Sequence, residues 1–168
     1  MKIFHSMALS DSQKDQTARH VAILQASYHR YTGKYLFDPK LDASEAIAWL
    51  ERASFALVSH GIQPDPIFNY GNQTALQLFS MTWDEFTRMP SRLSAEPVDR
   101  AERTRLLDRV SRDGYIDDYT GVRIAGDGRR FLIRHATVWN LLDESDHFYG
   151  QAAMIPEWEV LQTMFAAD

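Results

Sequence analysis

The sequence predicts an α+β domain in which a five-stranded antiparallel sheet is crossed on one face by short helices and one longer helix. Helix-period apolar spacing occupies the first third of the chain, two short β-type runs follow, and three longer alternating runs come last. With 168 residues and 45% hydrophobic residues, the chain suits one domain with a closed core. We expect a helical extension over 1–53, the core over 54–156 and a short tail over 157–168.

The first helix is expected from about residue 12 to 31. Val21, Leu24 and Tyr28 recur on one of its faces, and Gly33 is placed to end it. This amphipathic helix has two interpretations of equal weight: it covers the sheet of its own chain, or it pairs with a second copy.

A second helix is expected over 43–52, with Asp42 as its N-cap. The β-type runs 55–61 and 67–70 follow, separated by a turn that contains two prolines. Their short spacing predicts an antiparallel pair.

The stretch 72–90 predicts two short helices with strong start signals. Asn72 or Thr74 is placed to cap the first. Thr82 and Glu85 form a capping box for the second, and the residues on either side of that box have the spacing of a hydrophobic staple.

A longer helix is expected over 98–113, with Gly114 as its stop signal. Strands over 115–125, 129–142 and 148–155 follow, joined by a Gly-Asp-Gly turn and a polar turn. Pro156 is expected to end the last strand. The two early strands must pair with these three to complete a sheet.

Composition narrows the function classes. A net charge of −5 argues against direct nucleic-acid or anionic-membrane binding, although arginines concentrate between Arg88 and Arg134. The chain has no cysteine, which excludes disulfides, thiolate metal sites and a cysteinyl flavin adduct. The histidines lack metal-binding spacing, and the long helix has no histidine for haem. We therefore expect no metal site. No signal peptide or membrane-spanning segment is expected either, so we predict a cytoplasmic protein.

Two motifs resemble the PAS fold, a small sensor and interaction module. "NYGNQTALQLFSMTWDEF" resembles its strand-to-helix signature, and "AGDGRRFLIRHATVW" resembles its hairpin with Asp-Gly at the tip. "SHGIQPDPIFNYGNQTALQLF", "PSRLSAEP", "RDGYIDDYTGVRI" and "ATVWNLL" together are similar to the MEKHLA family, a PAS-like domain found alone in bacteria and at the C-terminus of certain plant transcription factors. The resemblance covers roughly 15–156.

The resemblance implies a small-ligand pocket between the sheet and the crossing helices. Each face of the late strands mixes apolar with hydrogen-bonding groups, as a pocket requires, although ordinary core packing is the commoner explanation for any single aromatic. The expected pocket candidates are Tyr70, Phe79, Trp83, Leu106, Val110, Tyr119, Arg134, His135, Trp139 and Asn140.

Of two adjacent carboxylates, Asp117 and Asp118, one is expected to face inward and the other outward, because neighbours on a strand point to opposite faces. One of them can act as a general base, but an ion pair with Arg123, Arg130 or Arg134 is the preferred interpretation. His135 can shuttle protons, or simply form a hydrogen bond.

The leading functional hypothesis is a stand-alone sensory or interaction module that binds a small ligand, a protein partner or a second copy. No catalytic residue and no particular cofactor is assigned. The alternative is a small cavity enzyme of the isomerase or hydratase type that uses an Asp/His/Tyr cluster. A deep pocket containing a contact between His135 and Asp117 or Asp118 would favour the enzyme.

Overall fold

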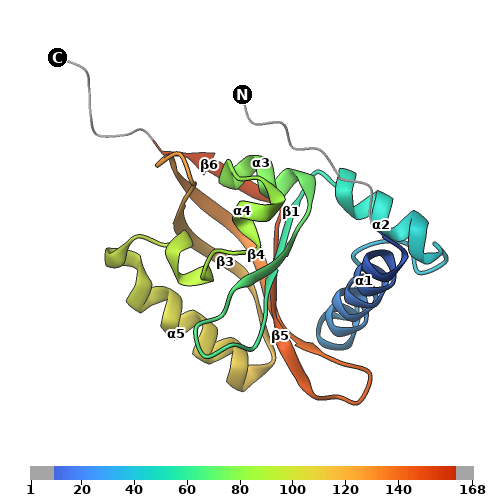
Figure 1. Ribbon diagram of the computed structural model, residues 1–168. Helices are drawn as coiled ribbons and strands as arrows, with labels where there is room; N and C mark the ends of the chain where they lie inside the picture. The colour runs from blue at the N-terminus through green and yellow to red at the C-terminus, as the bar shows by residue number, and fades with distance from the viewer. Residues whose placement is uncertain (1–9, 162–168) are drawn as a thin grey trace.

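One antiparallel sheet runs through the molecule and separates two helical layers (Figure 1). The computed structural model describes residues 10–161; residues 1–9 and 162–168, at the ends of the predicted extension and tail, lie outside the described residues. The strand order is β2-β1-β5-β4-β3, and β6 pairs with β4. The α+β prediction is confirmed, with one strand more than expected. The strands are β1 Ala56–His60, β2 Phe68–Gly71, β3 Tyr115–Ile124, β4 Arg130–Leu142, β5 Phe148–Ile155 and β6 Glu157–Val160.

The sixth strand continues β5 beyond Pro156. Thr137 of β4 pairs with Met154, and Arg134 pairs with Glu157, so β6 keeps the register of β5. Pro156 interrupts the ladder, because proline has no N–H to donate. β5 therefore ends before Pro156, as expected, but it is not the last strand, because pairing resumes one residue later in β6.

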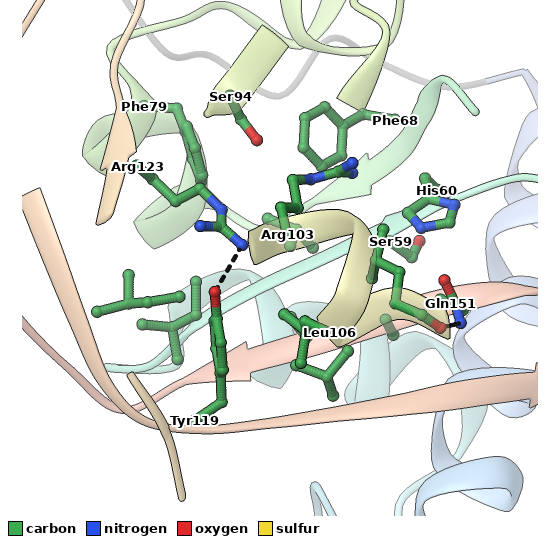
Figure 2. Close-up of a pocket in the computed structure, with 17 residues that line it drawn as sticks. Ser59, His60, Phe68, Phe79, Ser94, Arg103, Leu106, Tyr119, Arg123 and Gln151 are labelled. Atoms are coloured by element: carbon green, nitrogen blue, oxygen red, sulfur yellow. Dashed lines mark hydrogen bonds between the residues drawn. The ribbon is translucent and has the colours of Figure 1, made fainter. Parts of the chain in front are cut away.

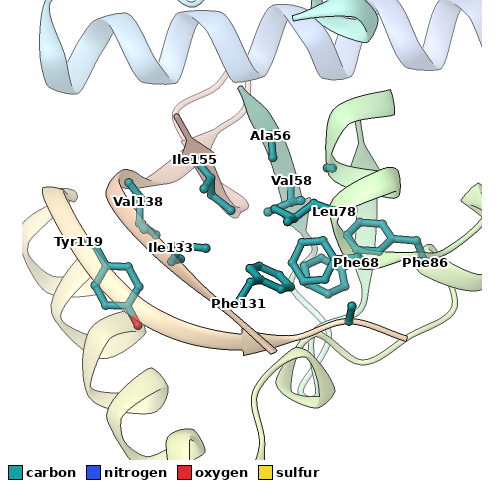
Figure 3. Packing of buried hydrophobic residues seen from close by; sticks show 14 of the residues in the cluster. Ala56, Val58, Phe68, Leu78, Phe86, Tyr119, Phe131, Ile133, Val138 and Ile155 are labelled. Carbon is teal, nitrogen blue, oxygen red and sulfur yellow. The ribbon is translucent and has the colours of Figure 1, made fainter. Parts of the chain in front are cut away.

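The helices cover both faces of the sheet. The predicted short and long helices cross one face, which we call the α5 face, and the two N-terminal helices pack on the other, the α1 face. Figure 3 shows the aromatic and aliphatic core of the α5 face. The helices are α1 Asp11–Thr32, α2 Ala43–Arg52, α3 Gln73–Phe79, α4 Trp83–Phe86 and α5 Pro97–Asp113, with a 3-10 turn η1 Ser91–Ser94.

Local signals place the helix ends where the sequence predicts them. Asp42, Asn72 and Thr82 each accept a hydrogen bond from a backbone N–H in the first turn of their helix. Gly33 ends α1 in the left-handed conformation, with φ of 73°. These ends depend on neighbours in sequence, so tertiary packing leaves them unchanged.

Three irregular residues change which face a strand presents. Asn69 is an extra residue in β2, because Ser59 pairs with Tyr70 while His60 pairs with Phe68. Phe68 consequently packs on the α5 face and Tyr70 on the α1 face.

In the hairpin of β3 and β4, Asp118 and His135 adopt positive φ values of 55° and 56°. The strand faces switch at these residues: Ile133 and Val138 both pack on the α5 face, whereas Trp139 packs on the α1 face. Asp117 and Asp118 are both exposed. The expectation that one of these two carboxylates faces inward is therefore wrong, because the ladder is irregular between Ile116 and Tyr119 and the alternation breaks there.

Among residues 10–161, no helix combines the length and the apolar character needed to cross a membrane.

Candidate ligand-binding site

A narrow pocket lies between the α5 face of the sheet and helix α5 (Figure 2). Its cavity volume is about 60 Å³. A water molecule needs about 10–15 Å³ by this measure, so the space suits a small organic molecule or a few waters. The lining residues are Val58, Ser59, His60, Phe68, Phe79, Ser94, Arg103, Leu106, Leu107, Tyr119, Arg123, Ile133, Val138, Gln151, Ala152, Ala153 and Ile155.

Two arginines reach this pocket from different elements. Arg103 lies on the inner stripe of α5, and one of its terminal nitrogens, Nη2, donates to Ser91 Oγ at 2.7 Å. Arg123 of β3 is 7% exposed. It donates from Nη1 to the Val122 carbonyl at 2.8 Å. Burial lowers the pKa of Arg103 to about 10, and the positive charge of Arg123 acts in the same direction. The pocket therefore holds two positive charges in a poorly solvated space.

The Tyr119 hydroxyl links Arg123 to the carboxylate of Glu102. Arg123 Nη2 donates to the Tyr119 hydroxyl at 3.2 Å, and that hydroxyl donates to Glu102 Oε2 at 3.0 Å. Burial raises the pKa of Tyr119, while the charge of Arg123 opposes the rise. Tyr119 is therefore protonated at neutral pH, and its hydroxyl donates the hydrogen bond that Glu102 accepts.

His60 contributes an acceptor to the pocket wall. Its Nδ1 lies 3.0 Å from the Gly61 carbonyl oxygen, so Nδ1 carries the hydrogen and Nε2 is a bare acceptor. This buried Nε2 forms no hydrogen bond within residues 10–161. Burial lowers the pKa of His60 and the positive charge of Arg103 acts in the same direction. The Gly61 carbonyl and the Gln151 side chain oppose this shift, and the ring is neutral at neutral pH.

Gln151 holds the far end of the pocket to α5. Its amide Nε2 lies 3.3 Å from the Leu107 carbonyl oxygen and 3.1 Å from Asn140 Oδ1. Asn140 in turn donates to the Val110 carbonyl at 3.0 Å. These contacts join the central strands to the helix above them, so a movement of α5 must disturb this end of the pocket.

The structure distributes the predicted site residues over several places. Phe79, Leu106 and Tyr119 line the pocket. Val110 lies in the core beside it, and Asn140 lies behind Gln151.

The other five predicted residues lie elsewhere. Trp139 packs edge-on against Tyr28 of α1, with ring centroids 5.0 Å apart. Arg134 is exposed and pairs with Glu159 of β6 at 2.8 Å. The remaining three, all away from this pocket, are Tyr70, Trp83 and His135.

Sequence reasoning missed the charged part of the site. Arg103 lies on the same stripe of the long helix as apolar residues, and that stripe faces the core. An arginine at such a position is the sequence signal that could have indicated a buried charge. Arg123 was considered only as an ion-pair partner for Asp117 or Asp118. His60 and Gln151 carried no local signal, because the pairing of β1 with β5 brings them together.

A second, more open groove lies on the α1 face, with a volume of about 370 Å³. Tyr70 and Trp83 form part of its wall. Beneath it, His20 contacts Ser59 Oγ through Nε2 at 2.8 Å. The Ser59 hydroxyl donates its own hydrogen to Asn69 Oδ1. Ser59 Oγ must therefore accept from His20, so the hydrogen of the His20 ring is on Nε2. Burial lowers the pKa of His20 to about 4, so this ring is neutral and its role here is to link α1 to the sheet.

The contact that would have favoured an enzyme forms, but outside the pocket. His135 Nδ1 lies 2.7 Å from Asp118 Oδ1, with side chains 60% and 76% exposed. Solvent screens such a pair, so neither desolvation nor a closed cavity supports acid–base chemistry there. Within the described part of the chain, no cluster of three or more histidine and acidic side chains is arranged to hold a metal ion.

Comparisons with known proteins agree with this fold. The model of the MEKHLA domain matches residues 18–160. The PAS domain of a protein from Colwellia psychrerythraea is 15% identical, with a TM-score of 0.58 over 67% of this chain and 92% of that one. A light-oxygen-voltage domain described with a flavin analogue is 16% identical, with a TM-score of 0.54 over 71% of this chain and 86% of that one.

An RNA-binding light-oxygen-voltage receptor is 14% identical, with a TM-score of 0.56 over 71% of this chain. This chain spans 34% of that receptor. No curated protein matches the sequence. At these identities the solved structures show a shared PAS-like fold.

Proposed function

Because this chain belongs to the MEKHLA family and has a PAS-like sensory fold, we propose that it is a sensor module that binds a small molecule in the pocket beneath α5. Occupancy of the pocket changes the position of α5, and the module passes the signal on by association with a protein partner or a second copy. The proposal includes the cytoplasmic location that the sequence predicts.

The observation that carries this proposal is a small interior cavity with polar groups left open to a ligand. Most of its walls are apolar, yet His60 Nε2 is a buried acceptor without a hydrogen bond from the described residues. Buried polar atoms normally have partners, because leaving one unpaired costs about 1–3 kcal/mol. A bound molecule that donates to His60 would remove that cost.

Association is supported by exposed aromatic side chains on the helical layers. Trp49 of α2 is 45% exposed, and Tyr35 just after α1 is 50% exposed. Trp83 of α4 is 42% exposed. Large aromatic side chains are enriched where proteins meet, since they bury much area with few rotatable bonds.

Native mass spectrometry of the purified protein, followed by denaturation and small-molecule analysis, tests both parts. We expect a retained small molecule and a change in oligomeric state or partner binding when it is removed. Ala153→Leu, which fills the pocket, should release the molecule, whereas Ala101→Leu on the exposed side of α5 should retain it. Equal retention by wild type and Ala153→Leu would place the ligand elsewhere and overturn the proposal.

A further inference from the structure

We propose that the pocket ligand is a short-chain organic carboxylate whose charged end lies between Arg103 and Arg123. This inference rests on the proposed function and specifies the chemical class of the ligand. It follows from the charges, the free hydrogen-bond donors and the size of the pocket.

The two arginines share the pocket without an acidic partner of their own. Neither forms an ion pair with any residue in the range 10–161, whereas seven other arginines in that range do so with a nearby carboxylate. Glu102 reaches Arg123 only through the Tyr119 hydroxyl. Two buried like charges repel each other, and a single anion placed between them relieves this repulsion.

The guanidinium groups also have donors to spare. Each guanidinium has five N–H groups, and the hydrogen bonds described above use one from Arg103 and two from Arg123. Figure 2 shows both side chains reaching into the same space, Arg103 from α5 and Arg123 from the sheet. A carboxylate matches the planar fork of a guanidinium and accepts two hydrogen bonds at once.

The remaining walls select a ligand with a short apolar body. Phe68, Phe79 and Leu106 surround the charged end with carbon. A cavity of about 60 Å³ is far smaller than the roughly 300–1,000 Å³ of pockets that hold drug-sized molecules. Neutral His60 adds no further positive charge to the two arginines. These features favour a carboxylate of about four to six non-hydrogen atoms over phosphate, which has no apolar part.

The test is calorimetric titration of the unfolded-and-refolded, ligand-free protein with butanoate, butanamide and inorganic phosphate at constant ionic strength. We expect butanoate to bind at least about tenfold more tightly than butanamide, which has nearly the same shape without the charge. Arg103→Gln and Arg123→Gln should each weaken butanoate binding by about tenfold or more. Arg105→Gln, on the exposed side of α5, should leave binding within about twofold.

The affinities of wild-type protein for butanoate, butanamide and phosphate test the carboxylate inference even if an arginine variant fails to fold. Equal binding of butanoate and butanamide, or tighter binding of phosphate, overturns the carboxylate inference and leaves the small-ligand pocket standing. Retention of a neutral molecule by the native protein has the same consequence. Failure of all probes, together with no molecule retained by the native protein, overturns the proposed function as well.

Discussion

Replacing Asn72 with alanine should destabilise this protein severely, since one side chain ties three elements together. Asn72 is 0% exposed. Its Oδ1 accepts from the backbone N–H groups of Leu57 and Ala75, each at 3.0 Å. Its Nδ2 donates to the carbonyls of Leu50 at 2.9 Å and Phe55 at 3.0 Å. The end of α2, strand β1 and the start of α3 therefore meet at one amide.

The magnitude follows from these four hydrogen bonds. A typical buried hydrogen bond contributes about 0.5–1.5 kcal/mol, and a buried backbone group left unpaired costs about 1–3 kcal/mol. We expect Asn72→Ala to lower the free energy of unfolding by about 4 kcal/mol, a large part of the roughly 5–15 kcal/mol that holds a domain folded. Asn72→Ser keeps an oxygen for the N-cap bond to Ala75 and should lose less.

Urea unfolding followed by circular dichroism measures these differences. Thr82→Ala is the matched control, because Thr82 caps α4 at an exposed position and should cost only about 1 kcal/mol. A loss below about 1.5 kcal/mol for Asn72→Ala would show that water or local rearrangement satisfies the freed groups, and would refute the reasoning. The reasoning would also be refuted if Asn72→Ser were no more stable than Asn72→Ala.

Three further predictions use the same assay. As pH falls from about 6.5 to 4, the unfolded chain binds a proton at His20 before the folded protein does. The free energy of unfolding should therefore fall by about 3 kcal/mol over this range. His20→Gln should flatten this dependence on pH. Gly150→Ala should cost more than about 3 kcal/mol, because its Cβ would meet the His60 carbonyl oxygen and φ is 153°. Leu24→Ala, at a fully buried site between α1 and the sheet, should cost about 2–5 kcal/mol, and a negligible loss would contradict the packing of α1 on its own chain.

The sequence alone determined the five α-helices, the first five strands and the caps at several helix ends, but not the sixth strand. The caps Asp42 and Thr82, the left-handed Gly33 and the capping box with Glu85 act within a few residues, so their geometry can be predicted from spacing. The order of these elements, together with the family resemblance, identified the PAS-like fold before any contact was known.

Only the tertiary structure decided which side chains meet in the pocket. Single-residue irregularities at Asn69, Asp118 and His135 reverse the faces of three strands, and simple alternation cannot predict them because they arise from pairing across the sheet. Tyr70, His135 and Trp139 were expected in the pocket, and none of them lines it.

The charged part of the site has the same origin. Arg103 and Arg123 are 20 positions apart in the sequence, and each alone has the appearance of a surface charge. Their meeting depends on how α5 lies over β3, a contact between elements that local sequence signals do not encode. The helix ends are local and could be predicted, whereas the pairing of two buried cations is a property of the packed fold.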